Sequence, residues 1–257
     1  MPTFNYKNCN INYTVSGKGS AMVFLHGFLE NLTMWNEIIP HLSKKRKVVC
    51  IDLLGHGETE NLGYKHTMEE QAHLVRALLK SIDIRKATLI GHSMGGYIAL
   101  AYADLYPKNT KGVCLLNSTA FADTHEKKIN RDRAIAAVKE NHKTFIKVAV
   151  PALFSIKSHE IHKSEIKEVV KDALQTSQQG VIAALEGMKI RPDRSAILER
   201  DDLNKILILG KGDGILPIKQ HKKLADGNNT KFYELPLGHM SHIEAAQDVI
   251  NIFKAEL

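Results

Sequence analysis

Residues 91–95, Gly-His-Ser-Met-Gly, carry the pattern G-x-S-x-G, whose spacing can make a serine a nucleophile. The pattern follows the apolar run 87–90 and opens a stretch with helical spacing that Pro107 ends. A serine at a sharp strand-to-helix turn is held in a strained conformation that projects its hydroxyl group. The N-terminus of the following helix favours negative charge beside it. We therefore predict that Ser93 is a catalytic nucleophile.

A serine in this position needs a sheet to carry it, and the apolar runs of the chain predict one. Five such runs are typical of buried strands, and they lie at residues 21–25, 47–51, 87–90, 112–116 and 205–209. Residues 231–235 predict a sixth strand. Segments 4–9 and 11–15 alternate with polar residues and predict two further strands. Because strands alternate with helical patterns, we predict an α/β fold with a mostly parallel eight-stranded sheet flanked by helices.

The alternation stops between residues 119 and 200, where we find helical patterns and no convincing strand. These patterns cover residues 127–141, 143–154, 163–177 and 179–189. We predict a core of residues 1–118 and 201–257, with a helical cap (lid) of residues 119–200 inserted after the sixth strand. Such a cap would form the upper wall of the pocket and exclude water from the serine.

Composition excludes several classes of protein. The 257 residues are 44% hydrophobic and 25% charged, which is typical of a globular chain and not of a disordered one. No apolar run approaches the roughly 18 residues that span a bilayer, and residues 1–7 lack the pattern of a secretory signal. The three cysteines form no C-x-x-C pair, which favours a reducing, cytoplasmic location. The net charge of +7 is scattered along the chain, so we predict no nucleic-acid partner and no membrane insertion.

Together these motifs resemble the α/β-hydrolase family, in its capped, serine-esterase-like branch, from the His26-Gly27 motif to the last helix. The resemblance implies that an acid and then a histidine follow the nucleophile along the chain. Asp213, in the loop after the run 205–209, matches the family's acid. His239, directly after Gly238, matches its histidine. A rival position for the acid, at the end of the strand before the cap, holds Asn117, with Asp123 as a second choice just beyond it.

Other histidines compete with His239, because the chain has 13 of them. We expect His242 to cap a helix or face solvent, and His26 to join loops by hydrogen bonds. His56 has a structural role by this resemblance, and His92 either lines the pocket or packs behind it. The chain has no H-E-x-x-H motif and no compact ligand cluster with zinc spacing, so we predict no metal.

The negative oxygen of a tetrahedral intermediate needs two backbone N–H donors. One should be Met94, directly after the nucleophile, and by the family pattern the other is Phe28, which follows His-Gly. Seven residues are candidates for lining the pocket, with packing inside the cap or beside the serine as the alternative. They are His92, Phe121, Phe145, Leu153, Phe154, Met188 and Leu216.

The function expected from this resemblance is that of a serine hydrolase without a cofactor. Its partner would be a small-molecule carboxylic ester with a small to medium acyl group, cleaved through an acyl-enzyme intermediate. Alternatives are a C–C bond hydrolase or lyase with the same triad, or a non-enzymatic ligand receptor. The related menaquinone-pathway lyase has arginine where this chain has Tyr97, which counts against the lyase. The acyl length, a lactone or linear ester, enantioselectivity and the oligomeric state are left open.

Overall fold

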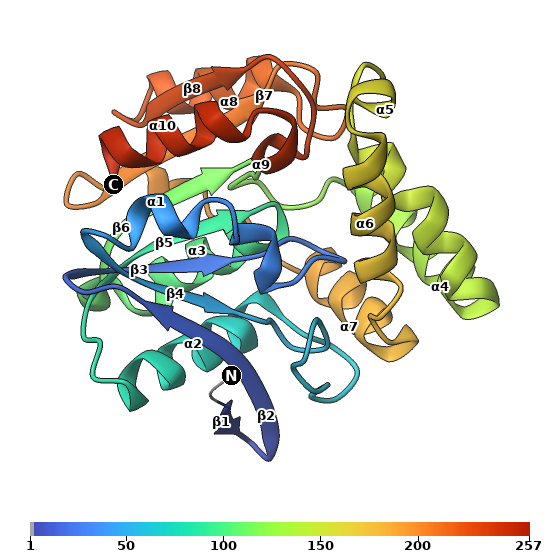
Figure 1. Cartoon of the computed structure of the whole chain (residues 1–257), viewed down its shortest axis with the longest axis horizontal. Coiled ribbons are helices and arrows are strands. Elements are labelled where there is room, and N and C mark those ends of the chain that lie inside the picture. The colour runs from blue at the N-terminus through green and yellow to red at the C-terminus, as the bar shows by residue number, and fades with distance from the viewer. Residues whose placement is uncertain (1–2) are drawn as a thin grey trace.

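A computed structural model describes residues 3–257, and it contains an eight-stranded sheet in the order β1-β2-β4-β3-β5-β6-β7-β8 (Figure 1). The pairs β1–β2 and β2–β4 are antiparallel, and the other pairs are parallel. The strands are β1 (Thr3–Tyr6), β2 (Cys9–Ser16), β3 (Ser20–Leu25), β4 (Arg46–Ile51), β5 (Ala87–His92), β6 (Thr110–Leu116), β7 (Asn204–Gly210) and β8 (Lys231–Leu235). The predicted fold class is confirmed.

Helices cover both faces of this sheet because its central strands carry apolar side chains on both sides. In β3, Val23 and Leu25 pack in a cluster with α2 and α3, whereas Met22 and Phe24 pack with α1 and α10. The helix α8 packs on the same face as α3. These helices are α1 (Ile39–Leu42), α2 (Met68–Ser81), α3 (Met94–Leu105), α8 (Ile218–Asp226) and α10 (Ala246–Glu256). The short α9 (Ser241–Glu244) precedes α10.

The segment between β6 and β7 is helical and stands at the end of the sheet to which the parallel strands point (Figure 1). It contains α4 (His125–Ala149), α5 (Ser158–Ile161), α6 (Lys163–Ala173) and α7 (Gln178–Lys189). The two helices predicted over residues 127–154 form the single element α4, which is broken at Asn141 by a non-helical φ of −154° and ψ of 91°. That this segment acts as a cap domain stays a prediction.

The helix α7 contacts the core through its backbone. A Cβ atom on Gly187 would lie 1.8 Å from the carbonyl oxygen of His66, and one on Gly180 would lie 2.3 Å from that of Gly55. The N–H of His66 also donates to the carbonyl oxygen of Ala183, at 2.9 Å. Glycine is therefore required at the contact face, because any side chain would separate α7 from the loop beneath it.

Two further properties bear on the sequence predictions. Cys9, Cys50 and Cys114 are all buried and all free, as expected for a chain without a disulfide framework. Within residues 3–257, no helix combines the length and the hydropathy that a membrane span requires.

Candidate active site

Ser93 lies at the turn from β5 into α3, where the sequence predicts a nucleophile. Its φ of 49° and ψ of −113° are strained for a residue with a side chain. The turn is tight because strand and helix approach closely, and a Cβ atom on Gly95 would lie 2.2 Å from the carbonyl oxygen of Leu25. The N–H of Ser93 donates to the carbonyl oxygen of Leu116 at 3.0 Å. The hydrogen bond to β6 and the close packing against β3 therefore hold Ser93 in its strained conformation.

The structure brings the three predicted triad residues together. His239 Nε2 lies 2.9 Å from Ser93 Oγ, and His239 Nδ1 lies 2.7 Å from Asp213 Oδ2. The three residues follow β5, β7 and β8, so the carboxyl ends of three parallel strands converge on one point. The side chains of His239 and Asp213 are buried, with 4% and 0% exposure. This is the geometry of a serine activated by an oriented base.

Asp213 is held as a carboxylate by several donors. The N–H groups of Ile215 and Leu216 donate to its Oδ1 at 2.8 and 3.2 Å, and Asn117 Nδ2 donates to its Oδ2 at 3.2 Å. Burial alone would raise the pKa of Asp213, but the hydrogen bond to His239 and its charge lower it, with help from Ile215 and Asn117. An ionised Asp213 accepts the Nδ1 proton of His239, which leaves Nε2 free to accept from the serine hydroxyl.

One predicted oxyanion donor directly follows Ser93 in the sequence, and the other lies in the loop after the neighbouring strand β3. Phe28 lies in the loop after β3, and Met94 is the first residue of α3. Within residues 3–257, neither amide donates a hydrogen bond to a protein acceptor. Both N–H groups are therefore available to a ligand, and their role in holding an oxyanion stays a prediction.

A cavity of about 560 Å³ lies between α6 and the segment 29–37, with Glu30 and His242 among its lining residues. It includes neither Ser93 nor any of the seven predicted lining residues. The seven lie elsewhere. Leu153 and Phe154 pack with Met240, Phe145 and Met188 pack in the cluster around α3, Leu216 packs near α8, Phe121 contacts the ring of His221, and His92 contacts Glu30. Their contact with a substrate stays a prediction.

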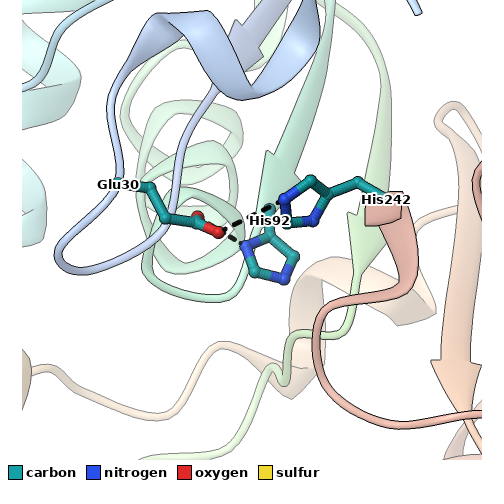
Figure 2. A group of neighbouring side chains, drawn as sticks. All are labelled: Glu30, His92 and His242. Atoms are coloured by element: carbon teal, nitrogen blue, oxygen red, sulfur yellow. Dashed lines mark hydrogen bonds and ion pairs between the residues drawn. The ribbon is translucent and has the colours of Figure 1, made fainter. Parts of the chain in front are cut away.

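The sequence analysis missed a polar cluster beside the triad, made by Glu30, His92 and His242 (Figure 2). The expectation that His242 caps a helix or faces solvent is wrong, because this residue is only 5% exposed and packs 4.9 Å from the ring of His92. The one available signal was Glu30 itself, a carboxylate in an otherwise apolar loop directly after His-Gly. The ligand atoms of the three residues lie within 4.8 Å of one another. The distance of 2.7 Å from His92 Nδ1 to Glu30 Oε2, however, is that of a hydrogen bond. His92 and Glu30 are therefore hydrogen-bonded directly to each other.

The other candidates have structural contacts. His26 Nε2 accepts the N–H of Leu53 at 2.9 Å, so His26 joins two loops as expected. Asp123, the second choice for the acid, is bound by Arg131 at 2.9 Å and by Arg191 at 2.8 Å. The guanidinium of Arg191 also lies 3.9 Å over the ring of Tyr97. A positive charge thus lies over Tyr97, and the single carboxylate of Asp123 is shared between Arg191 and Arg131.

Comparison with known proteins agrees with this geometry. A family profile described as the alpha/beta hydrolase fold matches residues 20–246. The chain belongs to the alpha/beta hydrolase family. Among solved alpha/beta hydrolases, an esterase from Thermogutta terrifontis superposes with a TM-score of 0.91 and 28% identity, over 96% of this chain and 92% of that one.

Two curated relatives are also similar. One is the dihydrolipoyllysine-residue acetyltransferase component of the acetoin cleaving system of Pseudomonas putida, which is 30% identical over 239 residues, or 90% of this chain. This alpha/beta hydrolase spans only 61% of the length of that relative. The other is a Bacillus subtilis protein provisionally named 2-succinyl-6-hydroxy-2,4-cyclohexadiene-1-carboxylate synthase. It is 28% identical, over 91% of this chain and 90% of the relative.

Proposed function

We propose that this protein is a serine hydrolase that cleaves carboxylic esters of small to medium acyl groups. The observation that carries the proposal is the continuous hydrogen-bonded chain from Asp213 through His239 to Ser93 Oγ, with distances of 2.7 and 2.9 Å. The similarity to the Thermogutta terrifontis esterase supports ester chemistry over most of the chain.

In the proposed reaction, Ser93 Oγ attacks the ester carbonyl while His239 Nε2 takes the hydroxyl proton. The carbonyl oxygen becomes negative and accepts the N–H groups of Phe28 and Met94. His239 then gives its proton to the leaving alcohol, and an acyl group remains on Ser93. A water molecule attacks this acyl group as His239 removes its proton. His239 then returns that proton to Ser93 Oγ as the acid leaves, which restores the serine. Asp213 stabilises the positive charge of His239 in both steps.

The experiment is a hydrolysis series on aryl esters of increasing acyl length, with the wild type and Ser93→Ala measured side by side. We expect turnover of short esters, and a loss on the order of 10⁶-fold in kcat for Ser93→Ala, because triad members act as a unit. The length profile would then measure the size of the pocket. Equal rates for the two proteins would refute the serine mechanism. No turnover above background by the wild type would refute the ester substrate.

The similarity to the Bacillus subtilis protein favours a second candidate, a lyase that forms a cyclohexadiene carboxylate. The triad would serve there as well. Against it stands Tyr97, whose neighbouring Arg191 is bound to Asp123 and is not free to hold a substrate carboxylate. Direct assay for formation of the cyclohexadiene carboxylate decides between the two. Product from the wild type, together with inert aryl esters, would establish the lyase.

A further inference from the structure

The cluster behind the triad joins three segments that have no sequence proximity. Glu30 comes from the loop after β3, His92 ends β5 and His242 belongs to α9 (Figure 2). All three are buried, with exposures of 7%, 1% and 5%. A buried carboxylate beside two imidazoles is costly unless it is paired, so its arrangement requires an explanation.

The hydrogen bonds of His92 fix the protons on its ring. Its Nε2 lies 2.9 Å from the carbonyl oxygen of His239, which can only accept, so Nε2 carries a hydrogen. Its Nδ1 lies 2.7 Å from Glu30 Oε2, which also accepts the N–H of Gly27 at 2.6 Å. Two bare lone pairs would repel at that distance. A second hydrogen on Nδ1 satisfies every contact and makes His92 an imidazolium paired with a carboxylate.

The surrounding charges agree with this assignment. Burial would lower the pKa of His92, but the charge and hydrogen bond of Glu30 outweigh burial and raise it, with help from His239 and Asp213. Burial would raise the pKa of Glu30, but His92 chiefly, with His242 and His26, lowers it to about 2. Burial lowers the pKa of His242 to about 3, so this ring is neutral. His242 Nε2 lies 3.6 Å from Glu30 Oε1, and its ring covers the pair.

The pair contacts three of the segments that the proposed reaction uses. Glu30 holds the amide of Gly27, the residue before the predicted oxyanion donor Phe28. His92 directly precedes Ser93 and holds the backbone carbonyl of His239. The fit is close, because a Cβ atom on Gly27 would lie 2.3 Å from Glu30 Oε2 and 2.8 Å from His92 Nδ1.

We propose that Glu30 and His92 form a charged positioning pair that keeps the amide of Phe28 and the ring of His239 aligned with Ser93. The inference rests on the proposed function, since it assigns a role within that site. Neither side chain needs to touch substrate. Both act through the backbone segments that they hold. Displacing a catalytic group by about 1 Å can cost roughly 100-fold in rate, so even a small shift in these loops would be measurable.

The kinetic test compares Glu30→Gln with Glu58→Gln, which removes an exposed carboxylate from the loop after β4. We expect Glu30→Gln to lower kcat by about 10- to 100-fold with KM nearly unchanged, because alignment and not binding is lost. The alkaline limb of its kcat profile should move to lower pH, since the carboxylate no longer holds the second proton on His92. Glu58→Gln should match the wild type. Unchanged kcat and pH profile in Glu30→Gln would overturn the inference.

A second measurement is made on the wild-type protein and uses one variant only to assign the signal. In wild-type protein with ¹⁵N-labelled histidine, one buried imidazole should show two N–H groups at pH 8, and this signal should vanish in His92→Gln. A neutral His92 in that spectrum would overturn the inference even if Glu30→Gln fails to fold. The failures are distinguishable. If Ser93→Ala is inactive and Glu30→Gln is fully active, only the positioning pair is refuted. If Ser93→Ala is active, the proposed function is refuted, and the ¹⁵N spectrum then tests the charge state of the pair independently.

Discussion

Asn117 donates one hydrogen bond from Nδ2 to Asp213 Oδ2 at 3.2 Å and another to the carbonyl oxygen of Gly238 at 3.1 Å. The residue at the rival position for the acid thus supports the acid at the other position. It directly follows β6, which lies beside the strand β7 that precedes Asp213. Its φ of 44° is one that Asn and Asp tolerate better than most residues.

This arrangement predicts that the acid can be moved. Asp213→Asn should lower kcat by about 10⁴-fold, because an amide holds the wrong tautomer of the histidine. Adding Asn117→Asp to that variant should recover part of the loss, since a carboxylate then lies beside the same site. The measurement is kcat on a short aryl ester for the single and double variants. A double variant no faster than Asp213→Asn would show that a carboxylate at position 117 cannot orient His239.

The ion pair between Asp123 and Arg191 predicts a pH-dependent contribution to stability. Burial would raise the pKa of Asp123, but Arg131 and Arg191 outweigh it and lower the pKa. A depressed pKa means that the stabilisation is present above the unfolded-state pKa and is lost as pH falls through the folded-state value. Asp123→Asn should therefore lower the free energy of unfolding by about 3–5 kcal/mol at pH 7 and by much less in acid.

Denaturant titrations at pH 7 and pH 3 check this expectation. Asp132→Asn is a suitable control, because its partner Lys189 also pairs with Glu186 and Asp132 is 61% exposed. An exposed pair of this kind contributes about 0–1 kcal/mol. An equal cost for Asp123→Asn at both pH values would mean that packing, and not charge, explains its effect.

The cysteines should be inert in the folded protein. Burial is the main cause that raises the pKa of Cys50 to about 12, and burial also raises the pKa of Cys114. Thiolates are the reactive form, so a thiol reagent at pH 8 should modify neither residue until the protein unfolds. The absorbance released by a chromogenic thiol reagent, with and without denaturant, measures the number of reactive thiols. Fast modification of two or more thiols in native buffer would contradict the prediction.

The contact of α7 with the core predicts that Gly187→Ala destabilises the protein by about 1–3 kcal/mol or more, because its Cβ would lie 1.8 Å from a backbone oxygen. Gly227→Ala is the matched control, since its nearest neighbour would lie at 3.6 Å and its φ is −74°. Thermal unfolding of both variants checks the difference. Equal unfolding temperatures for the two variants would show that the loop below α7 shifts to accommodate the added methyl group at little cost in stability.

The fold could be predicted from the sequence because its strands and helices carry local, periodic signals. Asp213 and His239 were instead identified by resemblance to a family, and the catalytic role of the triad stays a prediction. The runs at β3 and β5 are apolar on both faces, and G-x-S-x-G encodes its own turn at Ser93. The partnership of Glu30 with His92 could not be predicted in the same way, because it depends on how two loops meet across 62 residues. His242 illustrates the same limit, since helical position alone does not say that a histidine will be enclosed.

The backbone contact of α7 also limits how this family member can diversify. A helix that lies directly on a loop, with glycines at the contact, tolerates few changes on that face. The helix α6 instead meets the rest of the chain through apolar side chains such as Ile166 against Met240, and it borders the 560 Å³ cavity. Side chains can be exchanged there without moving a backbone. We therefore expect sequence drift and laboratory evolution to change residues of α6 far more readily than residues on the contact face of α7.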